Sequence, residues 1–324
     1  MSNILASVLL LTYNQEKFVE QSLQSLMDQD IDDLEIVVSD DNSSDNTWLK
    51  IVEIASRYTG SKSIVLNCNT NNLGVVDNFF KAFELSKGEV LFTAAGDDIS
   101  LPKRCSSSIS CWVNADRKPD LVATDAYDMG LDGHILGIKY TDNLQIWNLK
   151  KWTLCRPFIF GASQMTTRRL LNIGGFDPLL PYEDQCLLFR ALLMGGAIRL
   201  PQPLVMHRRG GISQQPKDYS YTNKKKKLLQ SSIDSLAECE QMILDATYMS
   251  APLFVLKKLE SNKFISQYLQ HMMLANNFIE KLLLFIFSAE IPFPKRFRYF
   301  QFAVFSGAHS TLMKFKQFLN SPST

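Results

Sequence analysis

Three pairs of adjacent acidic residues have types and a spacing that could do chemistry. Asp40-Asp41 and Asp97-Asp98 each follow a short apolar run, and Glu183-Asp184 begins a helical pattern. Carboxylates bind hard divalent cations, accept hydrogen bonds from hydroxyl or imide groups, and remove protons from hydroxyls. Each pair also fits a plain structural interpretation, such as a helix cap or a solvated turn.

The pair Asp97-Asp98 comes directly after Gly96. Adjacent carboxylates at a strand end suit Mg²⁺ or Mn²⁺, which can complete its shell with diphosphate oxygens. The alternative is a solvated turn, where Asp is common. The pair Asp40-Asp41 could accept hydrogen bonds from a nucleobase imide N–H or a ribose hydroxyl, or it could cap the helix expected near Thr47. Tyr13 could stack on a base or simply pack.

The pair Glu183-Asp184 could act as a general base towards a sugar hydroxyl, because a shielded carboxylate near other acids has a raised pKa. Taken alone, it is explained better by capping of the helix that follows. His207-Arg208-Arg209 follows a later apolar run and could add a metal ligand or cations for a diphosphate. The alternative for this run is a basic surface.

These residues must be positioned by alternating strands and helices. Four apolar runs predict buried strands, and amphipathic helical patterns separate them; the runs are Ala6–Leu11, Glu35–Ser39, Ser63–Leu66 and Glu89–Ala94. These strands are apolar throughout, so neither face of the sheet can be exposed to water. This indicates an α/β fold, in which a mostly parallel sheet is flanked by helices. Ligands of such sheets bind beyond the carboxyl ends of the strands, where Tyr13, Asp41 and Asp97 fall.

The pattern becomes less regular further along the chain. Leu121–Thr124 and Arg199–Val205 predict strands, Gly130–Gly137 predicts a hairpin turn, and Gln185–Met194 predicts a helix. The polar segment Gln214–Asn223 indicates a linker, and helical patterns follow it. We therefore expect a catalytic domain over 1–215 and a helical accessory region over 216–324.

The composition narrows the class of protein. The chain has 324 residues, 46% of them hydrophobic and 21% charged, with a net charge of +1. A net charge this small gives no positive electrostatic potential that would attract nucleic acid. Six cysteines without a CxxC pair suit reduced thiols, and neither a signal peptide nor a run of about 20 apolar residues is found. We expect a cytoplasmic protein.

Five motifs in order carry a resemblance to a known family. They are TYN, DDNSSDNT, NNLGVVDN, AAGDDISLP and GGFD…ED, beginning at Thr12, Asp40, Asn71, Ala94 and Gly174. With this order and spacing, the chain from about Ser7 to Ser213 resembles the inverting glycosyltransferases of family 2, which have the GT-A fold. The resemblance implies transfer of a glycosyl unit from a nucleotide-sugar, with UDP-sugars favoured.

The resemblance also implies roles for individual residues. A tyrosine matching Tyr13 stacks on the base, Asp41 holds a uracil-type base, and Asn72 and Gly74 line the nucleotide pocket. The remaining residues of the implied nucleotide-sugar site are Thr12, Asn14, Asp40, Asp97 and Arg208. Asp98 is the implied ligand of Mn²⁺ or Mg²⁺, with His207 as a second ligand. Asp184 is the implied general base, with Glu183 beside it.

Three departures from the family pattern shape the expectation. The family's histidine just after the last strand is not cleanly matched by His207. Ala95 stands where many members have a further Asp, so a full DxD motif is missing. The QxxRW motif of processive synthases is absent after Asp184, which favours addition of a single sugar. The family often builds bacterial surface polysaccharide, such as O-antigen or capsule, on lipid-linked acceptors. The apolar and basic stretches after residue 216 could then be a helical lid or dimer contact, or rest on an anionic membrane.

Two other interpretations of the sequence compete with a glycosyltransferase. A nucleotidyltransferase or a Rossmann oxidoreductase would carry a glycine-rich loop after the first strand, where this chain has Thr12–Lys17 without glycine. A catalytically inactive nucleotide-sugar-binding or scaffold protein of the same fold is supported by Ala95. Retention of Asp41, Asp98 and Asp184 together argues against it.

Overall fold

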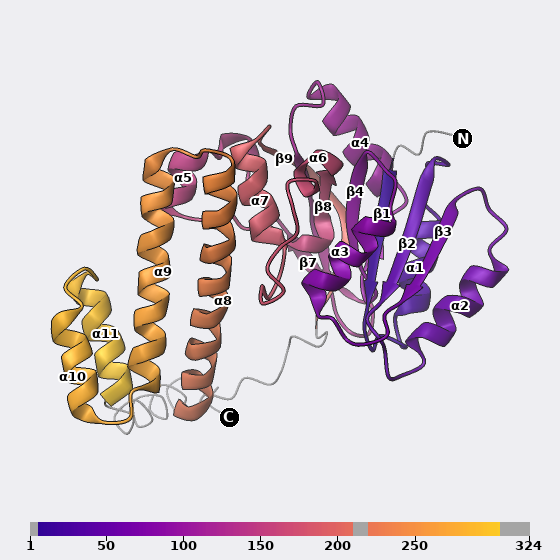
Figure 1. Ribbon diagram of the computed structural model, residues 1–324. Helices are drawn as coiled ribbons and strands as arrows, with labels where there is room; N and C mark the ends of the chain where they lie inside the picture. The colour runs from indigo at the N-terminus through magenta and orange to yellow at the C-terminus, as the bar shows by residue number, and fades with distance from the viewer. Residues whose placement is uncertain (1–5, 210–219, 305–324) are drawn as a thin grey trace, which may run out of the picture. The chain divides into compact units, whose positions relative to one another are not determined.

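The computed structural model describes residues 6–209 and 220–304. The chain divides into two compact units, Met1–Gln215 and Pro216–Thr324 (Figure 1). Each unit has its own hydrophobic cluster. Most of the expected linker Gln214–Asn223, including the expected boundary at 215/216, lies outside the described residues. Tyr221 and the residues after it begin a helix rather than a loop.

The N-terminal unit is built on a nine-stranded sheet. Its order is β3-β2-β1-β4-β8-β6-β9-β5, and β7 pairs with β6. The strands are β1 (Ala6–Thr12), β2 (Leu34–Asp40), β3 (Ser63–Cys68), β4 (Val90–Ala95), β5 (Ile99–Ser100), β6 (Leu121–Met129), β7 (Ile135–Lys139), β8 (Gln164–Thr167) and β9 (Ala197–Arg208). The first four strands are parallel, as expected, whereas β5, β7 and β8 are antiparallel to their neighbours, so the sheet is mixed.

Helices cover both faces of this sheet. They are α1 (Val19–Met27), α2 (Thr47–Arg57), α3 (Val75–Leu85), α4 (Arg104–Asn114), α5 (Leu149–Leu154), α6 (Arg168–Leu171) and α7 (Asp184–Leu193), with short 3-10 helices η1 (Leu144–Ile146) and η2 (Gly161–Ser163). Val8 and Leu10 belong to the cluster that packs against α1, α2 and α4. Leu9 points to the other face, where α3 contacts β1 and β2. Burial on both faces explains why the strands are apolar throughout.

The register brings the carboxyl ends of three strands to one edge. Thr12 of β1 pairs with Asp40 of β2, and Leu11 pairs with Ala95 of β4. The loops that follow these strands are therefore neighbours, as the strand pattern predicts. The short strand β5 follows Asp98 directly and pairs with β9, which anchors the acidic loop from its far side.

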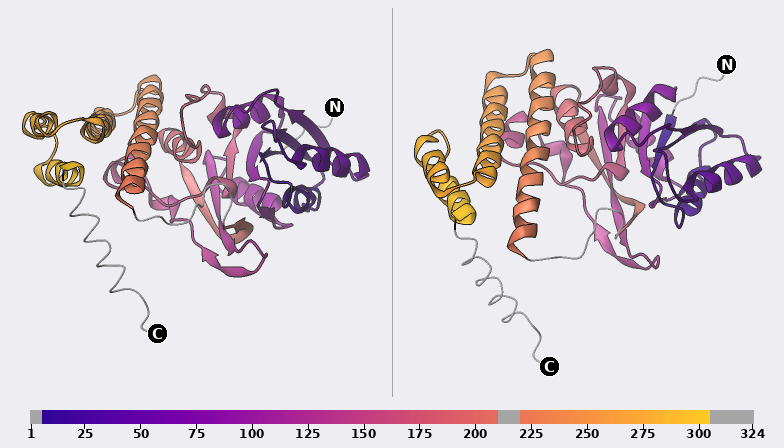
Figure 2. Two further views of the ribbon diagram at one scale, coloured as in Figure 1. Left: turned by 90° about the horizontal axis from the view of Figure 1, so that it is seen from below. Right: turned by 60° about the horizontal axis from the view of Figure 1, so that its bottom comes forward.

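The C-terminal unit is helical. It comprises α8 (Tyr221–Tyr248), α9 (Leu253–Leu274), α10 (Phe278–Phe287) and α11 (Phe293–Val304). Helices α8 and α9 run side by side, and α10 packs on α11 (Figures 1 and 2). Over the residues that the structure describes, no helix is long and apolar enough to cross a bilayer.

Candidate active site

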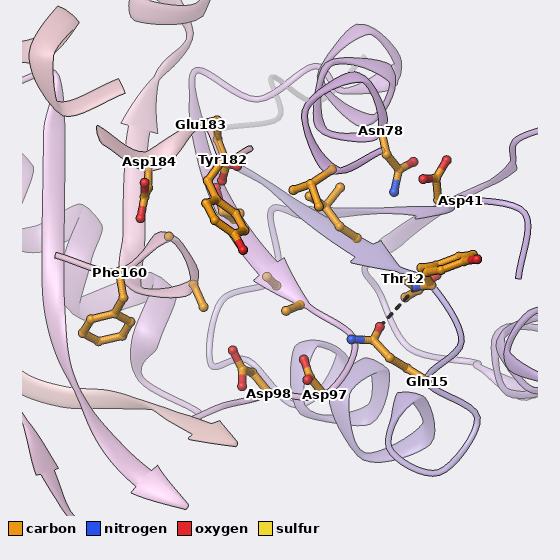
Figure 3. A pocket seen from close by; sticks show the side chains of 18 of the residues that line it. Thr12, Gln15, Asp41, Asn78, Asp97, Asp98, Phe160, Tyr182, Glu183 and Asp184 are labelled. Carbon is orange, nitrogen blue, oxygen red and sulfur yellow. Dashed lines mark hydrogen bonds between the residues drawn. The ribbon is translucent and has the colours of Figure 1, made fainter. Parts of the chain in front are cut away.

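A pocket of about 570 Å³ opens at the edge where these strands end (Figure 3). It is lined by the ends of β1, β4 and β9, the residue after β2, the start of α3, η2 and the start of α7. Eleven predicted site residues line it: Thr12, Tyr13, Asp41, Asn72, Gly74, Asp97, Asp98, Glu183, Asp184, His207 and Arg208. The two remaining predicted residues, Asn14 and Asp40, lie outside this lining.

Asp40 and Asn14 are engaged within the protein. The fully buried Asp40 carboxylate accepts hydrogen bonds from the Thr12 hydroxyl at 2.8 Å and from the Ser43 hydroxyl at 2.6 Å. The Asn14 side-chain oxygen accepts from the backbone N–H of Ser44 at 2.8 Å. Neither residue caps α2, whose N-cap is Asn46. Both residues instead fix the loops after β1 and β2, and their predicted contact with the nucleotide-sugar stays a prediction.

Asp41 fixes the loop between β3 and α3, which borders the pocket. Its Oδ1 accepts from Asn69 Nδ2 at 3.0 Å and from the Leu73 N–H at 2.8 Å, and its Oδ2 accepts from the Gly74 N–H at 2.9 Å. Gly74 has φ +86°, a conformation that side chains with a Cβ rarely adopt. The Asp41 carboxylate thus ties the loop before α3 to the end of β2 at the pocket wall.

Asp97 and Asp98 lie together on one side of the pocket (Figure 3). Burial raises the pKa of Asp97, and burial together with the charge of Asp97 raises the pKa of Asp98 to about 7. Asp98 Oδ1 accepts from the Arg208 N–H at 2.9 Å. Asp98 is buried, Asp97 is half-buried, and the strand β5 that follows them pairs with β9, which argues against a solvated turn.

The donor set of Asp97 and Asp98 fits a divalent cation in its chemistry. Carboxylate oxygens are the ligands that Mg²⁺ and Mn²⁺ prefer, and a cation would relieve the repulsion that raises the pKa of Asp98. In residues 6–209 and 220–304, no three His, Cys, Asp or Glu side chains come together to hold a metal ion. Oxygens of a bound diphosphate would have to complete the shell.

Glu183 and Asp184 lie across the pocket from Asp97 and Asp98 (Figure 3). Glu183 is the N-cap residue of α7, but its side chain makes no capping hydrogen bond. Burial and the charge of Asp184 raise the pKa of Glu183 to about 7. Asp184 Oδ1 accepts from the Gln185 N–H at 2.7 Å. Asp184, in the first turn of α7, thus serves the helix N-terminus, whereas the Glu183 side chain does not cap it.

The arginines of the run His207-Arg208-Arg209 are held by protein oxygens. Arg208 is buried, and its guanidinium donates to the carbonyl oxygens of Asp97 at 2.9 Å and Leu131 at 3.2 Å. Its third nitrogen donates to Gln21 Oε1 at 3.2 Å. Arg209 forms an ion pair with Asp128. Arg208 therefore supports the acidic loop, and its predicted contact with the nucleotide-sugar stays a prediction.

His207 lines the pocket beside a residue that sequence reasoning did not single out. Its Nδ1 lies 3.0 Å from Lys139 Nζ. Burial and the Lys139 charge lower the pKa of His207. His207 belongs to no group of three metal-ligating side chains within the described parts of the chain. Its role as a metal ligand stays a prediction at this point.

The lining residues that were not predicted from the sequence include Gln15, Asn78, Phe160 and Tyr182. Asn78 accepts a hydrogen bond from the Ser39 hydroxyl at 2.7 Å, and its signal was its place in the motif NNLGVVDN. Tyr182 is half exposed and directly precedes Glu183, which was its only sequence signal. Gln15 and Phe160 carry no signal beyond their neighbourhood in the sequence.

Comparisons with known proteins agree with this geometry. Residues 7–151 match the family model described as Glycosyl transferase family 2. An uncharacterised glycosyltransferase of Methanocaldococcus jannaschii is 28% identical over 182 residues, which are 56% of this chain and 61% of its own length. A GalNAc(5)-diNAcBac-PP-undecaprenol beta-1,3-glucosyltransferase of Campylobacter jejuni is 51% identical over 41 residues, 13% of each chain. The chain thus spans less than two thirds of the length of these relatives.

Solved structures resemble the chain over most of its length. The S. aureus TarS fragment 1–349 has a TM-score of 0.59 at 17% identity and covers 92% of this chain and 90% of its own. The same fragment in complex with UDP-GlcNAc gives 0.56. The mannosyltransferase PcManGT from Pyrobaculum calidifontis, in complex with GDP-Man and Mn²⁺, gives 0.52 at 15% identity and covers 95% of this chain and 87% of its own. The chain therefore has the GT-A glycosyltransferase fold, and the part of it that matches glycosyl transferase family 2 carries the acidic pairs Asp40-Asp41 and Asp97-Asp98.

Proposed function

We propose that the chain is a family 2 glycosyltransferase that moves one sugar from a nucleotide-sugar to an acceptor hydroxyl with inversion at the anomeric carbon. The observation that carries this proposal is the single pocket shared by Asp41, Asp97-Asp98 and Glu183-Asp184. The pairs come from three distant parts of the sequence, and capping explains neither Asp41 nor the Glu183 side chain.

Asp41 supports UDP as the nucleotide. We propose that its Oδ2, which accepts from the Gly74 N–H, also accepts the imide N–H of uracil, while Oδ1 holds Leu73. Cytosine and adenine offer no ring N–H at this edge, whereas uracil, thymine and guanine do, so Asp41 disfavours only the cytosine and adenine nucleotides. We propose that Tyr13 stacks on the base, and its 37% exposure at the pocket wall supports this role.

The chemistry we propose is one in-line displacement. Asp184 accepts the proton of the acceptor hydroxyl while the oxygen of that hydroxyl attacks the anomeric carbon. The bond between the anomeric carbon and the diphosphate oxygen breaks on the opposite side. Attack opposite the leaving group inverts the configuration. Mn²⁺ or Mg²⁺, held by Asp98 with Asp97 beside it, would supply positive charge for the departing diphosphate. Holding both substrates in one pocket lowers the entropic barrier.

The acceptor we propose is a saccharide on a lipid carrier, used in building a surface polysaccharide of the O-antigen or capsule type. The Campylobacter relative supports this, since its name places its acceptor on PP-undecaprenol. The helices of the C-terminal unit also support it. On α10, Ile279, Ile286 and Phe287 are 68%, 52% and 79% exposed. Such a face fits a chain that rests at the cytoplasmic side of a membrane.

The first test is turnover of a donor panel. The protein is incubated with Mn²⁺ and UDP-, dTDP- and GDP-sugars, and free nucleoside diphosphate is measured for wild type and Asp184→Asn. We expect slow hydrolysis of one donor by wild type and its loss in the variant. Binding of a donor without turnover would point to a missing acceptor, whereas no binding of any donor would contradict the proposal.

A second candidate is a catalytically inactive nucleotide-sugar-binding or scaffold protein of the same fold. Ala95 favours it, because this residue lines the pocket one residue before Gly96 and offers no carboxylate. The two candidates differ in one result. The scaffold would bind donor in calorimetry and turn none over, even when saccharide acceptors are supplied.

A further inference from the structure

The tyrosine and phenylalanine rings of the pocket differ in what holds them. Phe160 is buried, and its ring contacts the rings of Phe158 and His207. Tyr182 is 55% exposed and lines the same pocket. Across residues 6–209 and 220–304, no other aromatic ring contacts the Tyr182 ring, and no group forms a hydrogen bond with its hydroxyl. Both the ring and the hydroxyl of Tyr182 can therefore be used by a bound molecule.

The Tyr182 ring is directed into the pocket. Figure 3 shows it reaching from beside Glu183 towards the side of the pocket where Asp97 and Asp98 lie. A ligand that covers an exposed aromatic ring removes apolar surface from water, which favours binding. A tyrosine in this position is thus a binding surface rather than part of the hydrophobic core.

The chain itself places Tyr182 beside the proposed general base. Tyr182, Glu183 and Asp184 are consecutive residues of one pocket wall. Gly161 of η2 lies against the acidic pair, because a Cβ on Gly161 would be 3.3 Å from Glu183 Oε1 and 3.7 Å from Asp184 Cβ. The ring and the base are therefore held in one place, and a ligand that reaches Asp184 meets the same wall as Tyr182.

The other exposed tyrosine of the pocket belongs to a different wall. Tyr13 directly follows β1, whose end pairs with the end of β2, and Asp41 comes directly after β2. The proposed nucleotide contacts are on that side. The acceptor hydroxyl must instead reach Asp184 to lose its proton. Of the two tyrosines, Tyr182 is therefore the one beside the acceptor.

We propose that Tyr182 is the platform on which the acceptor sugar binds: its ring stacks on one face of a pyranose, and its hydroxyl donates a hydrogen bond to a hydroxyl of the same sugar. The proposal rests on the proposed function and names the part of the acceptor that the pocket recognises. A pyranose carries hydroxyls around its edge and C–H groups on its faces. A phenol ring, which is apolar on its faces and polar at its tip, matches this distribution.

Competition between a saccharide and water as acceptors tests the proposal. The donor that wild type hydrolyses in the donor panel is incubated with methyl glycosides of glucose, galactose, N-acetylglucosamine and N-acetylgalactosamine, each below saturation. Disaccharide and free sugar are measured in the same reaction. The ratio of disaccharide to free sugar depends on acceptor binding, whereas a general loss of folded enzyme lowers both products equally.

We expect the ratio of disaccharide to free sugar to fall in steps. Tyr182→Phe keeps the ring and loses one hydrogen bond, so the ratio should fall about threefold. Tyr182→Leu also loses the stacking surface, and the ratio should fall about tenfold or more. The control is Tyr140→Leu, which removes a tyrosine that is 62% exposed and lies outside the pocket lining. Its ratio should equal that of wild type.

Two results would overturn the role of Tyr182. An unchanged ratio in Tyr182→Leu would do so, and a raised KM for the donor with an unchanged ratio would place the ring against the donor sugar instead. An equal fall in Tyr182→Phe and Tyr182→Leu would leave the hydroxyl contact and overturn the stacking. The melting temperature of each variant checks its fold.

Failure of the proposed function itself gives a different result. Wild type that forms neither disaccharide nor free sugar from any donor would contradict the proposed function. Wild type that hydrolyses a donor but glycosylates none of the methyl glycosides would leave the proposed function standing and overturn the proposal for Tyr182.

Discussion

At the scale of residues, the acidic pairs differ in what surrounds them. Asp40 is surrounded by hydroxyl and amide donors and stabilises loops. Asp98 and Glu183 have few donors and a like charge next to each, so burial raises the pKa of both to about 7. Such shifts cost stability and gather at functional sites, which is why these two carboxyls matter more for function than Asp40 does.

Glu183 gives a prediction about pH. Its folded pKa, about 7, lies above the ordinary value of 4.5, so the folded state binds this proton more tightly than the unfolded state. The cost is absent below pH 4.5, grows as pH rises, and is complete above pH 7. We expect Glu183→Gln to be more stable than wild type at pH 8, by up to about 3 kcal/mol, with little difference at pH 4.5. Urea denaturation at both pH values measures this.

The matched control is Glu84→Gln, an exposed glutamate on α3. Its effect on the free energy of unfolding should be small at both pH values. If Glu183→Gln gained no stability between pH 4.5 and pH 8, burial would not be what raises the pKa of Glu183.

At the scale of elements, Gly74 gives a prediction about the loop that leads into α3. Gly74→Ala places a Cβ at φ +86° and should lower the free energy of unfolding by about 1–2 kcal/mol. It should also weaken UDP binding, because the Gly74 N–H bonds to Asp41. The control is Gly133→Ala, which has the same φ in the β6–β7 turn outside the pocket. Equal weakening of UDP binding by both variants would refute the role of the loop.

The exposed face of α10 gives a second prediction at this scale. Ile279→Asn, Ile286→Asn and Phe287→Ser together should abolish co-sedimentation with anionic phosphatidylglycerol vesicles, since they remove the apolar area that would enter the interface. The control replaces Leu244 and Tyr248, which are 64% and 74% exposed on α8, by Asn. Equal binding by the two sets of variants, or no binding by wild type, would contradict a membrane contact through α10.

Local patterns explain what could be predicted at the level of elements. Short apolar runs predict the strands β1, β2 and β4, and the acidic residues follow these runs directly in the sequence. Parallel pairing of the strands then brings the acidic residues to one edge of the sheet. The antiparallel β8 was not predicted, because its place between β4 and β6 depends on pairing across distant segments. Lys139 was missed for the same reason. Its position beside His207 depends on the register of a hairpin with a shift at Asp128.

At the scale of the whole molecule, the pocket belongs to the N-terminal unit alone. All its lining residues lie between Leu11 and Arg208, within the unit Met1–Gln215. A ligand that binds only the folded state stabilises it by mass action, by about 2.7 kcal/mol at 100 times its Kd. The increase in stability on ligand binding should therefore appear in the N-terminal unit.

The matching prediction concerns ligand and metal removal. UDP with Mn²⁺ should raise the melting temperature. EDTA should reverse most of the rise, because without a cation the carboxylates of Asp97 and Asp98 would repel the charged diphosphate. Hydrogen exchange should show the added protection in residues 6–209 and not in 220–304. A rise that EDTA leaves untouched would contradict metal dependence.

The pairing of β5 with β9 also bears on the order in which the site is made during synthesis. Ile99 and Ser100 pair with Met206 and Val205, and the Arg208 N–H reaches Asp98 across more than a hundred residues of chain. A nascent chain that has reached only residue 196 already carries all three acidic pairs, yet it has no strand to hold the second pair. The acidic loop is thus synthesised early on the ribosome but becomes fixed only after β9 has emerged.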